Sequence, residues 1–177
     1  MTVRFGLVAL LLLLSACRHH DRQSALAGEI DRTAPLVVHL EKRIAAPPAT
    51  VWHLLTDIQA WPNWQPDIHA VEIRSPPRLG ARFDWTVDAG EIHSRIVLVS
   101  PEQRFAWTGR LFWFRAIHVW TLRPTSDGGT LVSCDESLSG LLLGWFMNRA
   151  DLSETDAHWL AALDTAATRQ ATAGSHL

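Results

Sequence analysis

The chain has 177 residues, 47% of them hydrophobic, and a formal net charge of −2 at pH 7. This length predicts one domain, and the apolar content is enough to bury a core. A net charge so close to zero gives no excess of positive charge to bind phosphates, so we predict no nucleic-acid partner. Nine tryptophans and no tyrosine are the unusual feature of the composition, and tryptophan suits either a wide core or a lined cavity.

Residues 1–16 have the pattern of an export signal. Arg4 precedes an apolar run over residues 5–14, which is too short to remain in a bilayer as a spanning helix. The run ends in Leu14-Ser15-Ala16-Cys17, which resembles a bacterial lipobox, although an ordinary signal with an incidental cysteine is the alternative. We therefore expect an exported lipoprotein, held at the cell membrane or outer membrane by lipidated Cys17 and facing the periplasm or the exterior.

Residues 17–35 are polar and lack a periodic pattern, so we expect a tether between the anchor and the folded domain. His19 and His20 are adjacent in this segment, and we interpret them as incidental rather than as metal ligands. Cys134 is the only other cysteine, so lipidation of Cys17 would leave no intrachain disulfide.

Leu36–Ile44 has the branched residues of a strand, and the two prolines that follow suit a strand exit and a first helical turn. Apolar residues at helical spacing then predict a helix with one buried face. Trp61 and Trp64 come next. They either clamp a short second segment onto the sheet or stack on a ligand ring. A short strand is expected over residues 68–74.

The stretch from 81 to 99 has the pattern of two strands joined at Ala89-Gly90. Hydrophobic and polar residues alternate, as in a sheet with one buried face. Pairing Asp88 with Glu91 keeps the alternation in step, whereas a slip by one residue would mix the faces. This register predicts four further cross-strand pairs: Val87 with Ile92, Trp85 with Ser94, Phe83 with Ile96, and Asp84 with Arg95.

A proline turn at residues 100–103 leads to the next predicted strand, residues 104–109. Folding back places Phe105 opposite Leu98 and Trp107 opposite Ile96. One concave face would then carry six large side chains: Phe83, Trp85, Ile96, Leu98, Phe105 and Trp107. Residues 109–114 (GRLFWF) are either buried under the sheet edge or form a cavity lip or membrane-facing loop.

Residues 115–124 and 130–138 are predicted to form a hairpin around a polar turn. If Pro124 lies opposite Thr130, the register places Trp120 opposite Cys134 and His118 opposite Glu136. A buried glutamate needs a partner. The pair can therefore be structural, can orient a ligand, or can act as a general acid and base.

The chain is expected to be helical from residue 141 onward. A break near Asp151, with Ser153 and Asp156 as a possible cap, and a single helix over 141–168 are both compatible with the pattern. Residues 173–177 would be a tail.

Two segments carry a resemblance to a known family: IAAPPATVWHLLTDIQAWPNWQPDI (residues 44–68) and RAIHVWTLRPTSDGGTLVSCDESLSG (residues 115–140). They resemble motifs of the bacterial branch of the polyketide cyclase/dehydrase and lipid-transport superfamily, which includes START and birch-pollen-allergen-like (SRPBCC) proteins. The resemblance covers residues 36–172. It implies an α+β helix-grip fold, in which a curved seven-stranded antiparallel sheet wraps around a long C-terminal helix and encloses a cavity.

The resemblance implies that this domain binds a small hydrophobic ligand, lipid-like or aromatic, without a cofactor or metal. The expected lining residues are Phe83, Trp85, Ile96, Leu98, Phe105, Trp107, His118, Trp120 and Glu136. We favour binding over catalysis, because the sequence contains no nucleophile elbow, phosphate loop or paired-ligand metal motif.

Two alternatives remain. The first is a cyclase or dehydratase in which His118 is the base and Glu136 orients it. The second is a ligand-free interaction module of the cell envelope, whose interior would be packed solid by tryptophans. The sequence does not indicate the oligomeric state.

Overall fold

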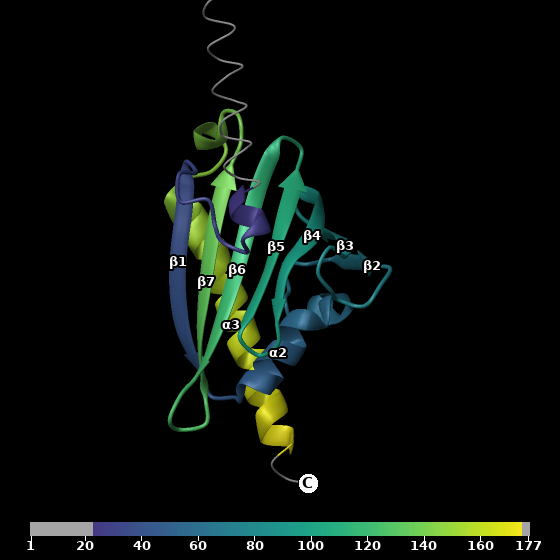
Figure 1. Ribbon diagram of the computed structural model, residues 1–177, viewed down its shortest axis with the longest axis vertical. Coiled ribbons are helices and arrows are strands. Elements are labelled where there is room, and N and C mark those ends of the chain that lie inside the picture. The colour runs from purple at the N-terminus through teal and green to yellow at the C-terminus, as the bar shows by residue number, and fades with distance from the viewer. Residues whose placement is uncertain (1–22, 175–177) are drawn as a thin grey trace, which may run out of the picture.

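The computed structural model describes residues 23–174, which form one antiparallel sheet with a long helix packed along one face (Figure 1). The strand order is β1-β7-β6-β5-β4-β3-β2. The predicted helix-grip fold is confirmed, with these elements: β1 (Leu36–Ile44), α2 (Pro48–Thr56), η1 (Ile58–Asn63), β2 (Ala70–Ile73), β3 (Arg82–Val87), β4 (Gly90–Ser100), β5 (Arg104–Leu111), β6 (Phe114–Pro124), β7 (Thr130–Ser139), η2 (Leu143–Trp145) and α3 (Arg149–Gly174). No described helix is long and apolar enough to cross a membrane.

The first helical segments follow from their prolines and apolar spacing. Pro47 has an extended backbone and Pro48 occupies the first helical position of α2, where a missing N–H costs nothing. The 3-10 segment η1 is clamped by Trp61, whose indole N–H donates to the carbonyl of Leu55 at 3.1 Å. Trp61 is fully buried and its ring packs edge-on against Phe83 and Trp85 of β3, as the clamp interpretation of this residue predicts.

The β6–β7 hairpin has the predicted register, with Pro124 opposite Thr130 and His118 opposite Glu136. The β3–β4 register differs from the prediction by two residues, because Val87 already pairs with Gly90. Gly90 has a φ of 132°, a conformation that favours glycine and lets the chain reverse one pair earlier.

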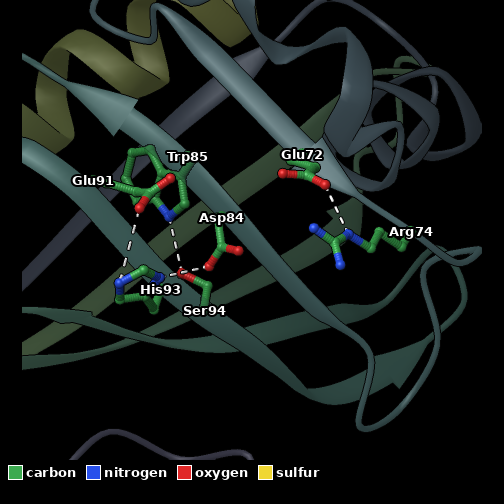
Figure 2. Close-up of polar contacts among 7 residues, drawn as sticks. All are labelled: Glu72, Arg74, Asp84, Trp85, Glu91, His93 and Ser94. Atoms are coloured by element: carbon green, nitrogen blue, oxygen red, sulfur yellow. Dashed lines mark hydrogen bonds and ion pairs between the residues drawn. The ribbon is translucent and has the colours of Figure 1, made fainter.

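An even shift keeps every side chain on its predicted face. Trp85 lies opposite Ile92 rather than Ser94, yet its indole still donates diagonally to Ser94 Oγ at 2.9 Å (Figure 2). Asp84 pairs with His93 rather than Arg95, and their side chains are 2.8 Å apart.

A bulge in β4 corrects the prediction for Leu98. Ile96 pairs with Trp107 as expected, but Leu98 pairs with Ala106, and Val99 takes the place opposite Phe105. The extra residue reverses the alternation. Leu98 therefore packs in the cluster on the outer face of the sheet, away from the face that contacts α3, and it cannot line a site between sheet and helix.

Part of the outer face of the sheet is covered by residues 23–34, which belong to the expected tether. Ala25 and Ile30 are buried against Ile117 and Val119. The backbone N–H of Asp31 also donates to Ser137 Oγ at 3.0 Å. This part of the tether prediction is therefore wrong: the segment is a cover for apolar residues on the outer strand faces.

The chain breaks between η2 and α3, as in the first of the two predicted arrangements, but the cap is a different residue. Asn148 Oδ1 accepts the backbone N–H of Ala150 at 2.7 Å, and Asp151 Oδ2 accepts the N–H of Asn148 at 2.9 Å. This reciprocal pair is a capping box. Ser153 and Asp156 lie inside the helix instead.

Within residues 109–114, Gly109 is buried in β5, but the middle of the segment is not buried under the sheet edge. Phe112 and Trp113 form an exposed turn between β5 and β6. The burial interpretation of this segment is therefore wrong.

Candidate ligand-binding site

The predicted pair of His118 and Glu136 spans β6 and β7. His118 Nδ1 lies 3.1 Å from Glu136 Oε2, and the two side chains are 12% and 5% exposed. Both point to the face of the sheet that α3 covers. The cross-strand geometry predicted from the sequence is confirmed for this pair.

Asp156 of α3 joins the pair, and the sequence analysis missed it. One ligand atom from each of His118, Glu136 and Asp156 lies within 4.8 Å of the others, and Asp156 is buried. Its spacing carried a signal: Asp156 lies four residues after Leu152 and four before Leu160, both buried on the apolar face of α3.

Burial changes the pKa of each member of this polar cluster. Desolvation lowers the pKa of His118 to about 4, while a weaker opposite effect comes from Asp156. Desolvation raises the pKa of Glu136 to about 7. The pKa of Asp156 is raised to about 9, first by desolvation and then by the neighbouring charge of Glu136. Near neutral pH the histidine is therefore uncharged and Asp156 is protonated.

Aromatic rings surround the polar cluster. The Trp107 ring stacks on His118 with centroids 4.9 Å apart, and Trp120 lies nearly parallel to Trp107 at 6.3 Å. Trp159 of α3 contacts both tryptophans from the opposite side. The predicted lining residues on this face are all buried: Phe83, Trp85, Ile96, Phe105, Trp107 and Trp120. The aromatic rings among them contact one another or Trp159 in the region where the resemblance implies a cavity.

Several buried polar atoms in this interior have no hydrogen-bond partner within residues 23–174. They include the indole nitrogens of Trp107 and Trp120 and Oδ2 of Asp156. An unmade hydrogen bond of a buried group costs about 1–3 kcal/mol. A bound polar group could supply the missing partners. The imidazole and two carboxyl groups are also a donor set that could hold a divalent cation such as zinc.

A separate open hollow of about 490 Å³ lies between α2, η1 and the loop after β2. Trp52, Thr56, Pro76 and Pro101 are among its lining residues. None of the predicted site residues lines it.

Only one of the two cysteines, Cys134, lies in the described part of the chain. Cys134 is buried and free, and burial raises the pKa of its thiol, which disfavours the nucleophilic thiolate. Cys17 lies outside the described residues, so its lipidation stays a prediction.

The fold and its buried polar cluster are consistent with one family of proteins, which a comparison of the sequence with family models identifies. Residues 35–166 match the family described as polyketide cyclase/dehydrase and lipid transport. Because the match covers most of the chain, the protein belongs to this family, and the resemblance noted from its sequence motifs is confirmed. Comparison with curated proteins gave no match.

Solved structures show the same fold at low identity. An aromatase/cyclase from Streptomyces sp. R1128 is 17% identical, with a TM-score of 0.65 over 76% of this chain and 94% of that one. A START superfamily protein from Mycobacterium smegmatis is 16% identical, with a TM-score of 0.61 over 77% and 97%. A norcoclaurine synthase mutant from Thalictrum flavum, in complex with a transition-state analogue, is 14% identical, with a TM-score of 0.60 over 76% and 94%.

Proposed function

We propose that the protein binds a small, mostly apolar molecule carrying one polar group, between the sheet and α3. The observation that carries this proposal is the buried polar cluster of His118, Glu136 and Asp156 inside a wall of tryptophans. Ligand sites are commonly apolar pockets with a few polar groups that fix orientation. The unpartnered atoms of Trp107, Trp120 and Asp156 would bind the polar group of the ligand.

Binding at this position requires the aromatic side chains to rearrange, because they contact one another in the closed structure. The neutral imidazole can accept a hydrogen bond, and the unpartnered indole N–H groups of Trp107 and Trp120 can donate one. A hydroxyl group on a lipid-like or aromatic ring compound would match both, and a carbonyl group would match the donors, without burying a further charge.

Native mass spectrometry of residues 18–177 tests this proposal. The protein would be purified and then mixed with a set of lipids and aromatic ring compounds. We expect a stoichiometric apolar adduct that Trp107→Glu abolishes and Asp156→Ala weakens, while Leu79→Ser, at an exposed position of the loop after β2, leaves it intact. A protein that stays unliganded throughout would contradict the proposal.

Two other functions have observations in their favour. The opposite pKa shifts of His118 and Asp156 suit a cyclase or dehydratase with a neutral base beside a protonated acid. Adduct formation followed by ring closure or loss of water in the bound compound would distinguish this enzyme from a carrier. The close packing of the tryptophan rings favours a ligand-free interaction module, which predicts no uptake of any compound.

We also propose that the mature protein is anchored through a lipidated Cys17, on the strength of the Leu14-Ser15-Ala16-Cys17 motif. A membrane fraction from cells expressing the full chain should contain an N-terminal peptide with the mass of a diacylated or triacylated cysteine. Cys17→Ser should remove that mass. Finding an unmodified Cys17 in the wild-type protein would exclude the anchor.

A further inference from the structure

Exposed large hydrophobic side chains gather at one end of the molecule. Six of the eight found in the described part of the chain lie on two loops, the β5–β6 turn and the segment between β7 and α3. Trp145 is 82% exposed and Phe112 is 69% exposed. We call this surface the apolar tip, and it consists of Phe112, Trp113, Leu141, Leu142, Trp145 and Phe146.

The two loops form one surface. The indole N–H of Trp113 donates to the carbonyl of Leu141 at 3.0 Å, and the rings of Trp113 and Phe146 lie 6.3 Å apart. Phe112 and Leu142 both have left-handed backbone, with φ of 53° and 58°, which costs roughly 1–2 kcal/mol for a residue other than glycine. A strained backbone that directs apolar side chains into water has no folding benefit, which points to an external partner.

The chemistry of the apolar tip matches a lipid bilayer surface. Tryptophan and phenylalanine beside leucine are typical of segments that lie in the interfacial region, where an indole ring has an apolar body and one polar N–H. Arg110 and Arg149, both exposed, flank the two loops in sequence. They would meet anionic headgroups.

The N-terminal part of the chain supports the same orientation. The purple helical segment at the start of the described chain lies in front of β6, on the same half of the molecule as η2 and the β5–β6 turn at the top (Figure 1). Cys17 precedes residue 23 by six residues, which span at most about 20 Å when fully extended. An anchor at Cys17 would therefore hold this end of the domain close to the bilayer.

We propose that the apolar tip is a membrane-contact surface that places Trp145, Phe146 and Phe112 in the headgroup region of an anionic bilayer. This surface lies outside the ligand interior, and its exposure does not depend on the anchor. Leu143 of the segment between β7 and α3 packs in a buried cluster with Leu138 and Leu152, and Leu152 lies one helical turn before Asp156. Contact with a bilayer would place that segment at the lipid surface.

Vesicle flotation of residues 18–177 tests the proposal without the anchor. This segment retains every contact described for residues 23–174. The vesicles contain phosphatidylcholine with or without phosphatidylglycerol. We expect binding to the anionic vesicles, and we expect the double variant Trp145→Ser/Phe146→Ser to bind at least about tenfold more weakly because two large apolar side chains are lost. The control Leu79→Ser, which removes another highly exposed side chain, should bind like the wild type.

Thermal unfolding would verify that both variants keep their fold, as expected for exposed positions. Absence of wild-type binding, or an equal loss in the double variant and the control, would overturn the proposal. So would a concentration-dependent dimer that the double variant abolishes without any vesicle binding, because the tip would then contact a second copy of the chain. Ligand uptake and Cys17 lipidation have separate readouts, so failure here is distinguishable from failure of the proposed function.

Discussion

Asp156 of α3 and Glu136 of β7 bring carboxylate oxygens within 4.8 Å of each other in an interior rich in tryptophan rings. Two buried carboxyl groups this close cannot both ionise at little cost, so the pair retains a proton near neutral pH. The helix therefore contacts the sheet through a protonated acid as well as through apolar packing. Because of this contact, the free energy of unfolding should depend on pH.

The first prediction concerns the pH dependence of unfolding. The pKa of Asp156 is raised from 3.8 to about 9, so the folded protein holds a proton that the unfolded chain releases near pH 4. Its contribution to the free energy of unfolding is complete below that pH and is lost as pH rises towards 9. His118 acts in the opposite sense, because its pKa is lowered from 6.5 to about 4, but its contribution changes only below about pH 6.5.

Between pH 7 and pH 9 the titration of Asp156 dominates the cluster. We expect the free energy of unfolding to fall by on the order of 2 kcal/mol over this interval. Asp156→Asn, which mimics the protonated acid, should flatten the profile, whereas Asp67→Asn, a change at a half-exposed carboxylate, should not. Urea unfolding at several pH values measures this, and an identical slope in wild type and Asp156→Asn would contradict the assignment.

The second prediction concerns the start of α3. Asn148→Ala removes the acceptor for the N–H groups of Ala150 and Asp151, and loss of such a cap costs about 0.5–2 kcal/mol. Ser153→Ala, at the position that the sequence indicated as a cap, should change stability by less than about 0.5 kcal/mol. The urea midpoints of unfolding of the two variants decide between the caps. A larger loss of stability in Ser153→Ala than in Asn148→Ala would support the cap predicted from the sequence.

The sequence predicted the features that depend on local alternation and strong turn signals. The polar turn after Pro124 sets the β6–β7 register, and that register brings His118 to Glu136. Alternation alone could not reveal the bulge beside Leu98. The residues of β4 around the bulge are apolar on both sides of the shift, so the sequence pattern shows no break there. Asp156 was missed because a polar residue on an apolar helix face has no identifiable partner until the helix is placed on the sheet.

The N-terminal cover was missed for a related reason. Its segment has few apolar residues, and Ala25 and Ile30 are too sparse to show a period. Their burial depends on apolar residues at the outer face of β5 and β6, which looked like exceptions in a polar pattern. Tertiary contact therefore decides the structure of this stretch.

The third prediction tests that cover. Ile30 is 5% exposed, and Ile30→Ala should destabilise the domain by about 2–4 kcal/mol through lost burial and the cavity left behind. Leu26→Ala provides the matched control, because Leu26 lies in the same segment but is 73% exposed. A flexible tether would make both variants neutral, so equal urea midpoints for the two would show that the segment does not pack on the sheet.

The fourth prediction concerns the junction that holds the apolar tip in place. A Cβ at Gly140 would lie 2.4 Å from Cδ1 of Phe114 and 3.2 Å from its Cα, so the clash involves the backbone as well as a ring. Gly140→Ala should therefore cost about 1–3 kcal/mol. It should also move the segment that carries Trp145.

Gly144→Ala is the control for this junction. A Cβ at Gly144 meets nothing within 4 Å, and replacing a glycine where the new side chain fits is neutral or slightly stabilising, because the unfolded chain loses freedom. If the apolar tip contacts membranes, Gly140→Ala should reduce vesicle binding although it leaves every exposed side chain in place, while Gly144→Ala should not. Wild-type binding by a destabilised Gly140→Ala would show that the arrangement of the two loops is unimportant, and that exposure of the side chains is enough.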